Sequence, residues 1–229
     1  MFLHLKNVLT TDELAHARSS LTAQAPWIAG SSSAGGQAVQ QKNNEQLSQD
    51  SDASRELQAL VLRAVQRDPL FFSAALPKRI FNPLFNRYSG DSNFYGEHVD
   101  GAVLHSGATQ QWVRTDISCT LFLAQPEEYE GGELVIRETL GERRIKLAAG
   151  DLIMYPGNTV HQVLPVTQGV RLASFFWVES MVRSTEQRKM LFDMDMALLK
   201  LRASVGERDP SVVVLTGTYH NLLRLWADV

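Results

Sequence analysis

The stretch 79–178 constrains the fold more than any other part of the chain, because short β-rich runs follow one another there, separated by glycine, proline, asparagine and aspartate. Strands are predicted at 79–88, 116–124, 133–137, 143–148, 151–155, 160–164 and 170–178. Residues 140–143 fit a hairpin turn. Short strands at this spacing predict a sandwich or a barrel, and a jelly roll of two sheets is one such architecture.

The preceding residues, 1–78, are predicted to contain helices. Apolar residues recur at helical spacing over 10–24 and 54–66, and a short third helix follows. The helix starts are marked by residues that commonly cap helices: Thr10 with Glu13 in a capping box, Ser54, and Asp68 followed by Pro69. Residues 29–52 are rich in glycine, serine, glutamine and asparagine, which predicts a surface loop or a mobile lid over a site.

After Ser180 the helical period returns. Apolar residues between 190 and 201 line one face of a long helix, and Asp209 followed by Pro210 can begin a last one. The apolar residues of these helices could form the interface of a homodimer. The chain is therefore predicted to have three parts: an N-terminal helical region (1–78), a β-rich domain (79–179) and a helical C-terminal extension (180–229).

The composition argues against several classes of protein. The formal net charge is -3 and the basic residues are spread along the chain, so there is no stripe that would neutralise nucleic-acid phosphates. No segment approaches the roughly 18 consecutive apolar residues of a membrane span, and the N-terminus lacks the pattern of a signal peptide. The single cysteine, Cys119, lies in an apolar run and is predicted to be a core residue. We expect a soluble, cytoplasmic protein that binds neither nucleic acid nor membrane.

Two of the six histidines are candidates for a metal site. His98 and Asp100 lie two residues apart in an extended segment, so both side chains can point to the same face and reach one cation. An imidazole nitrogen and a carboxylate oxygen suit Fe(II), Mn(II) or Zn(II). Downstream, His161 follows a turn over 156–158 and begins a strand. The other histidines are expected to be solvated (His4 and His16), in a polar loop (His105) and packed or at an interface (His220).

Arg171 completes the pattern. A hairpin turn over 165–169 would bring it near His161 on an adjacent strand, with both side chains facing the same interior. Two histidines and one carboxylate form a facial triad, which leaves positions on the metal open for a bidentate 2-oxo acid and O2. A 2-oxo diacid also has a distal carboxylate, which the planar fork of an arginine can grip with two hydrogen bonds.

These elements, in this order, resemble the prolyl 4-hydroxylase-like iron(II)/2-oxoglutarate dioxygenases, and in particular the bacterial PKHD-type hydroxylases. The shared residues are 86–90, 98–100, 131–134, 150–152, His161 and Arg171. The resemblance covers the core from about 79 to 179 and extends into both helical flanks, including 219–224. It implies an α+β protein whose β-rich core is a double-stranded β-helix, or jelly roll, with N-terminal helices packed on it and a helical C-terminal extension.

The resemblance also implies roles for individual residues. His98, Asp100 and His161 would be the iron ligands, and Arg171 would hold the distal carboxylate of 2-oxoglutarate. Further residues match the lining of the cofactor pocket: Tyr88, a family tyrosine, and Trp177, an aromatic wall on the same face as Arg171. Some relatives add a tyrosine from the strand that here spans 119–123. This chain has Phe122 near that position, and Thr120 is the expected substitute.

The implied reaction couples the oxidative decarboxylation of 2-oxoglutarate to succinate and CO2 with hydroxylation of a substrate by O2, and L-ascorbate would re-reduce oxidised iron. The substrate stays open between a prolyl or lysyl side chain of a peptide and a small iron-related metabolite. Two alternatives are a cupin-type metal enzyme that needs no 2-oxoglutarate and a jelly-roll binding module without turnover. Dependence of turnover on 2-oxoglutarate would distinguish the dioxygenase from a cupin-type enzyme. The presence of Arg171 argues against a binding module without turnover.

Overall fold

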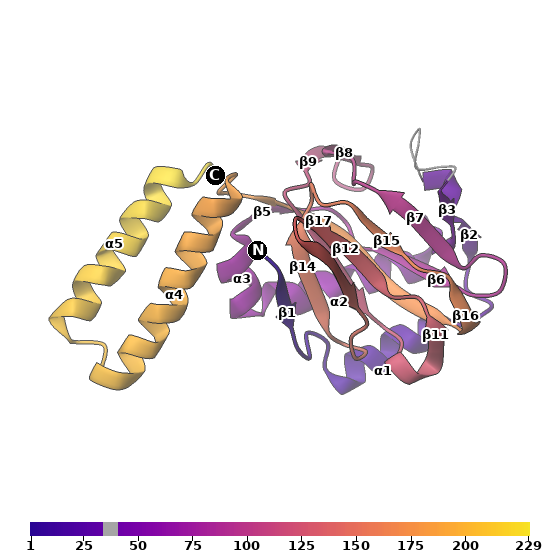
Figure 1. The fold of residues 1–229 in the computed structure, drawn as a ribbon, viewed down its shortest axis with the longest axis horizontal. Helices are drawn as coiled ribbons and strands as arrows, with labels where there is room; N and C mark the ends of the chain where they lie inside the picture. The colour runs from indigo at the N-terminus through magenta and orange to yellow at the C-terminus, as the bar shows by residue number, and fades with distance from the viewer. Residues whose placement is uncertain (34–40) are drawn as a thin grey trace.

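Two β-sheets that face each other form the centre of the computed structural model, which describes residues 1–33 and 41–229 (Figure 1). All strand pairs are antiparallel. The larger sheet contains, in spatial order, β1 (Leu3–Leu5), β14 (Leu152–Pro156), β10 (Ile117–Phe122), β17 (Arg171–Ser180), β6 (Leu84–Tyr88), β4 (Glu45–Leu47) and β2 (Trp27–Ala29), and β5 (Pro77–Ile80) also pairs with β17. The smaller sheet contains β13 (Gly141–Ile145), β12 (Leu134–Glu138), β15 (His161–Val163), β7 (Phe94–His98) and β3 (Lys42–Asn43).

Two short pairs of strands lie outside these sheets: the hairpin of β8 (Val103–Ser106) and β9 (Gln111–Arg114), and the pair of β11 (Tyr129–Gly131) with β16 (Val166–Gly169), which are distant in the sequence. Short 3-10 turns occur at Gly30–Ser33 and Pro126–Glu128. The two facing sheets confirm the predicted α+β class with a jelly-roll core.

The strands predicted for the β-rich domain lie close to observed strands, but β7, β11 and β16 were not predicted, and β16 lies where a hairpin turn was expected over 165–169. Two further differences concern residues 79–88 and His105. The run 79–88 is two strands, because Pro83 cannot donate a backbone hydrogen bond and interrupts the ladder. The expected polar loop around His105 is instead the β8–β9 hairpin, in which the His105 ring meets the edge of Trp112. In β8, Val103 and Leu104 are followed by His105 and Ser106, so the sequence lacks the apolar–polar alternation that marks a half-buried strand.

The helices begin where capping residues allow. α1 (Thr11–Ser20) has the predicted capping box of Thr10 and Glu13, and α3 (Pro69–Ala75) is capped by Asp68. α2 (Asp52–Gln66) begins earlier than predicted: Ser51 is the cap, and its hydroxyl accepts from the backbone N–H of Ser54. Towards the C-terminus, α4 (Thr185–Val205) and α5 (Pro210–Trp226) follow, capped by Ser184 and Asp209. None of the helices in the described ranges is long and apolar enough to cross a membrane.

The region 1–78 supplies more than helices, because β1, β2, β3 and β4 extend both sheets. His4, expected to be solvated, lies in β1 with its Nε2 2.7 Å from Oδ2 of Asp151. Of the expected loop 29–52, the described parts contain β3, β4 and the start of α2. Residues 34–40, to which the lid hypothesis also applied, lie outside the described residues.

The central strands separate two apolar layers. On β10, Cys119 and Leu121 belong to the layer that packs under α1, α2 and α3, while Phe122 belongs to the layer between the sheets. Cys119 is therefore the predicted core residue, and burial raises the pKa of its thiol. Because successive strand residues face opposite layers, Arg171 and Trp177 of β17 point between the sheets and Phe176 points to the helices.

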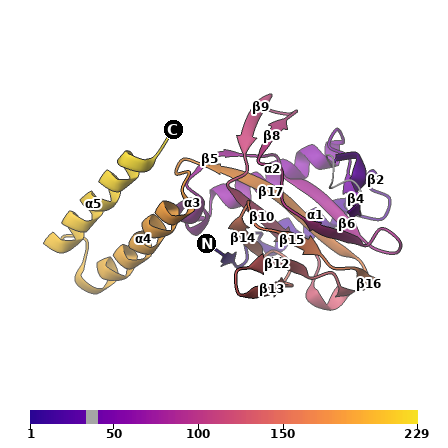
Figure 2. The same cartoon turned by 45° about the horizontal axis from the view of Figure 1, so that its top comes forward.

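The α4–α5 hairpin stands away from the sheets (Figures 1 and 2). It has its own small core, made of Leu76, Val182 and Leu191 with Tyr219, Leu222, Leu223 and Trp226 of α5. The backbone N–H of Asp228 donates to the carbonyl of Met181 (2.8 Å), so the chain returns to the start of α4. His220 is exposed on α5, which makes the packed alternative wrong.

Candidate active site

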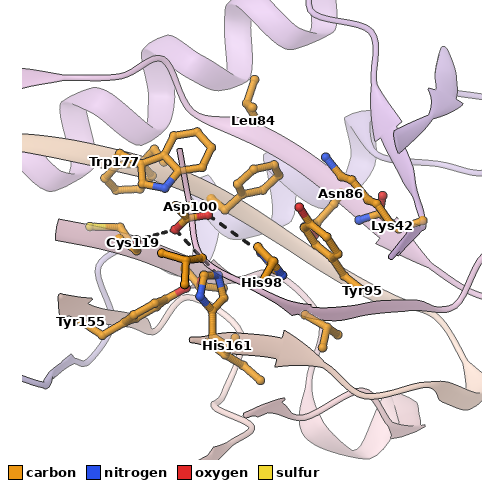
Figure 3. Close-up of a pocket in the computed structure, with 18 of the residues that line it drawn as sticks. Lys42, Leu84, Asn86, Tyr95, His98, Asp100, Cys119, Tyr155, His161 and Trp177 are labelled. Atoms are coloured by element: carbon orange, nitrogen blue, oxygen red, sulfur yellow. Dashed lines mark hydrogen bonds and ion pairs between the residues drawn. The ribbon is translucent and has the colours of Figure 1, made fainter. Parts of the chain in front are cut away.

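The three predicted metal ligands converge between the two sheets. His98 ends β7 and His161 begins β15, and the two residues lie opposite each other in the antiparallel pair. One ligand atom from each of His98, Asp100 and His161 lies within 4.8 Å of the others. The Nε2 atoms of His98 and His161 are 3.9 and 3.7 Å from the Asp100 carboxylate oxygens (Figure 3).

Neighbouring groups fix the orientation of each ligand. Nδ1 of His98 lies 2.8 Å from the carbonyl of Gly96, and Nδ1 of His161 lies 2.9 Å from the carbonyl of Thr159. A carbonyl can only accept, so both Nδ1 atoms carry the proton and both Nε2 lone pairs are free for a metal. Oγ of Ser118 donates to Oδ2 of Asp100 (2.6 Å).

Burial, and secondly the nearby His161, lowers the pKa of His98 to about 4. The imidazole is therefore neutral at neutral pH, which is the form that binds metals. Two neutral imidazole nitrogens and one carboxylate oxygen on one side of a pocket fit a divalent ion such as Fe(II).

Arg171 faces this triad from the opposite sheet. It begins β17, and the chain between His161 and Arg171 forms β16, which pairs with β11. The predicted placement of Arg171 on a strand adjacent to His161 is therefore wrong, because the connection crosses from one sheet to the other. The prediction that both residues face one interior is confirmed, since both line the same cavity.

The guanidinium of Arg171 is buried and incompletely paired. The residue is 1% exposed, and Nε and Nη1 have no hydrogen-bond partner among the described residues. The rings of Tyr88 and Phe122 lie 5.1 and 5.4 Å from its central carbon. Because unpaired buried donors on a charged group are costly, this pocket fits a carboxylate such as the distal one of 2-oxoglutarate.

Two further residues shape the surroundings of Arg171 and were not predicted to do so. Gly132 has φ +69°, and a Cβ there would lie 3.1 Å from Cδ of Arg171. The hydroxyl of Tyr129 is buried and interacts with the guanidinium of Arg171. Gly132 therefore leaves the space that the arginine side chain occupies.

A cavity of about 610 Å³ joins Arg171 to the triad. The predicted pocket residues Tyr88, Thr120 and Trp177 all line it, and the ring of Trp177 meets those of Phe81 and Phe175 edge-on. Lining residues that the sequence did not single out include Lys42, Asn44, Asn86, Tyr95 and Tyr155. Strand pairing brings Lys42 and Asn44 here from far along the chain, and no local pattern marks such residues.

Comparisons with known proteins agree with this geometry. Residues 83–179 match the 2OG-Fe(II) oxygenase superfamily, and residues 186–228 match the PKHD-type hydroxylase C-terminal domain. PKHD-type hydroxylases from Variovorax paradoxus (strain S110) and Nitrosomonas europaea are 59% and 53% identical to this chain, and each alignment covers 100% of both sequences.

Two solved structures share the fold at low sequence identity. A Trichoplax adhaerens prolyl hydroxylase, in complex with a hypoxia inducible factor peptide fragment, is 15% identical, with a TM-score of 0.55 over 83% of this chain and 86% of that one. A Pseudomonas putida prolyl-4-hydroxylase is 17% identical, with a TM-score of 0.50 over 78% of this chain and 92% of that one.

The fold and the matched superfamily define a 2OG-Fe(II) oxygenase, an oxidoreductase that requires iron(II) and 2-oxoglutarate. Sequence identity of 59% over the whole of both chains to a curated relative narrows the assignment from the superfamily to one family. The chain belongs to the PKHD-type hydroxylases.

Proposed function

We propose that His98, Asp100 and His161 hold the iron(II) of this hydroxylase and that Arg171 holds the distal carboxylate of 2-oxoglutarate. One observation supports this most directly: buried guanidinium donors without partners share a cavity with three convergent metal ligands. When bound, iron and 2-oxoglutarate supply the oxidising chemistry with O2, yielding succinate, CO2 and a hydroxylated product.

The protein's own side chains orient and shield these groups. The Gly96 and Thr159 carbonyls keep the Nδ1 protons in place, and Ser118 holds the Asp100 carboxylate. Tyr88 and Phe122 give Arg171 an apolar surrounding, which strengthens its attraction to a carboxylate. Thr120 and Trp177 complete the pocket wall, and the hydroxyl of Thr120 interacts with that of Tyr155.

Several further assignments belong to the same proposal. L-Ascorbate would act as the reductant that restores iron(II), as the family implies. The substrate would be a small molecule or a peptide, and neither nucleic acid nor a membrane would be a partner, since the net charge is -3 and no described helix spans a membrane. The enzyme would act in the cytoplasm as a homodimer formed by α4 and α5. An enzyme without 2-oxoglutarate is disfavoured, because it would leave the donors of Arg171 unpaired.

The metal assignment is tested by counting iron bound per chain under anaerobic conditions. His98→Ala and His161→Ala should each abolish stoichiometric binding and turnover while the circular dichroism spectrum is retained, because the remaining two ligands cannot complete the triad. His105→Ala is the matched control, since this histidine lies in the neighbouring β8–β9 hairpin. Full iron occupancy in both ligand variants would overturn the assignment.

The co-substrate assignment is tested by 2-oxoglutarate affinity, followed by the charge-transfer absorption of the anaerobic iron complex. Arg171→Ala should weaken binding by about 2–5 kcal/mol, the range for breaking a buried charged pair. Arg171→Lys should recover part of this, because an ammonium lacks the fork geometry. Pyruvate, which has no distal carboxylate, and the exposed Arg144→Ala are the controls. Equal affinity for 2-oxoglutarate in all proteins would mean that another group holds this carboxylate.

A further inference from the structure

The inner face of β10 leads from the proposed metal ligands to Arg171. Side chains two positions apart on a strand share a face, and on this face Ser118, Thr120 and Phe122 follow one another. Ser118 donates to Asp100 at 2.6 Å, and the ring of Phe122 lies 5.4 Å from the central carbon of the Arg171 guanidinium. Thr120, which lines the cavity, therefore lies between the triad and the arginine.

Tyr155 meets Thr120 from the neighbouring strand, β14, where it pairs with Ser118 of β10. Tyr155 is 3% exposed and lines the same cavity, and its hydroxyl is hydrogen bonded to that of Thr120. The rings of Tyr155 and His161 meet edge to face, with 5.2 Å between their centres. Figure 3 shows the Tyr155 side chain pointing towards the triad beside His161. The two hydroxyls thus lie next to the proposed metal ligands.

This pair of hydroxyls has one hydrogen more than its shared bond uses. Each hydroxyl carries a single hydrogen, so one O–H remains free to donate. Asp100 is a charged acceptor close to Tyr155, but its Oδ2 already accepts from Ser118 and its carboxylate is the proposed metal ligand. A phenolic O–H is the stronger donor of the two, and a bond accepted from Thr120 strengthens it further. The hydrogen of Tyr155 is therefore the one that a bound anion would take.

2-Oxoglutarate has an acceptor that suits this hydrogen. A 2-oxo acid chelates a metal through its oxo group and one oxygen of the adjacent carboxylate, so the second oxygen of that carboxylate still lacks a partner. A buried carboxylate oxygen without a donor is costly. Arg171 does not meet this need, because it is assigned to the carboxylate at the other end of the molecule.

We infer that Tyr155, oriented by Thr120, is a second anchor for 2-oxoglutarate and that its hydroxyl donates to the carboxylate next to the 2-oxo group. The inference rests on the proposed function. It makes the two anchors separable, because every 2-oxo acid has this carboxylate and only a diacid has the distal one. Binding of pyruvate should therefore depend on Tyr155 and not on Arg171.

Conservative variants of the full chain test this inference, with 2-oxoglutarate and pyruvate each titrated into the anaerobic iron(II) protein and followed by charge-transfer absorption. Tyr155→Phe keeps the ring beside His161 and should weaken both oxo acids by the same factor, about tenfold or more, as for a lost hydrogen bond to a charged group. Thr120→Val should weaken both by about threefold, and should add nothing in the Tyr155→Phe protein, because it acts through the tyrosine. Thr120→Ser should behave as the wild type. Tyr219→Phe, on α5 and outside the cavity lining, is the matched control.

Iron affinity, measured without an oxo acid, separates the possible outcomes. If Tyr155→Phe weakens both oxo acids equally and leaves iron affinity unchanged, the inference holds. If iron affinity falls by the same factor, the hydroxyl serves Asp100 and the inference is wrong. It is also wrong if 2-oxoglutarate alone is weakened, because the hydroxyl then serves the distal carboxylate, or if pyruvate does not bind or neither oxo acid responds. Only a wild type that fails to bind 2-oxoglutarate, or an Arg171→Ala variant that binds it equally well, would contradict the proposed function itself.

Discussion

At the scale of single residues, Gly132 is expected to control 2-oxoglutarate affinity without touching the co-substrate. Its φ of +69° strains any other residue, and a Cβ would lie 2.8 Å from Val166, 3.0 Å from Tyr129 and 3.1 Å from Arg171. Gly132→Ala should therefore push the Arg171 side chain out of place. We expect a loss of about 2 kcal/mol or more in stability, from strain of about 1 kcal/mol and overpacking of about 1–3 kcal/mol, together with weaker 2-oxoglutarate binding.

Gly90→Ala is the matched control for this prediction, because Gly90 also has a positive φ, +54°, but a Cβ at this position would point into open space, with no contact within 4 Å. It should show the backbone strain alone and leave 2-oxoglutarate affinity unchanged. Urea unfolding and anaerobic titration of 2-oxoglutarate give the two quantities. If both alanine variants bind 2-oxoglutarate like the wild type, Gly132 does not position Arg171.

The sequence predicts the residues of this site that belong to spaced motifs and misses those that pairing between distant strands brings in. His98 and Asp100 share a face because they are two positions apart, and Trp177 shares a face with Arg171 because the two lie an even number of positions apart on one strand. Lys42 instead enters the cavity because β3 pairs with β7. No local spacing predicts such a pairing, since register between distant segments is set by the whole sheet.

At the scale of elements, the ion pair between Glu13 and Arg67 is expected to join α1 to the end of α2. Hydrogen bonding to Arg67 lowers the pKa of Glu13 to about 2. Because the pKa is lowered in the folded state, the ion pair stabilises the fold fully at pH values above the ordinary pKa of a glutamate. This stabilisation is lost as the pH falls towards about 2. Since both groups are partly exposed, Glu13→Gln should cost only about 0.5–1 kcal/mol at pH 7, and progressively less as the pH falls from the ordinary pKa of a glutamate towards about 2.

This substitution isolates the charge, because a glutamine can still complete the capping box with Thr10. Asp12→Asn removes a charge from the same helical turn, and Asp12 forms no ion pair among the described residues. Urea unfolding of both variants at several pH values measures the difference. A cost for Glu13→Gln that stays constant between pH 7 and pH 2, or that equals the cost for Asp12→Asn, would contradict the role of Arg67.

Elements with a strong hydrophobic period or a capping residue were predictable from the sequence, and very short strands were not. The capping box of α1 and the Asp68 cap of α3 are local signals, so sequence spacing alone predicts both helix starts. β3 spans only Lys42–Asn43 and β8 only Val103–Ser106, so each is too short to show a periodic apolar pattern of its own. These strands form because a neighbouring edge supplies hydrogen-bond partners, which is tertiary information.

At the scale of the whole molecule, the α4–α5 hairpin leaves apolar residues exposed away from the jelly roll (Figure 1). On α5, Val213, Val214 and Leu215 are 59%, 67% and 41% exposed, and Leu225 is 75% exposed. Val214 and Leu225 lie about three helical turns apart and so share a face. Exposed apolar side chains gathered on one helix are typical of an association surface, and we therefore predict a homodimer that buries this face of α5.

Light scattering after size exclusion measures the mass in solution, against 25.5 kDa for one chain. The wild type should give twice this mass, and the double variant Val214→Asp, Leu225→Asp should give the monomer mass, because two buried carboxylates on each α5 would face each other without cations.

Leu140→Asp is the matched control: Leu140 is fully exposed in the β12–β13 turn, so the same change there should leave the dimer intact. The inner face of α5, with Leu222 and Leu223, packs against the start of α4 and is unchanged in these variants. Retained iron binding would show that the jelly roll survives dissociation, whereas a wild type of monomer mass would mean that the exposed face of α5 has another purpose.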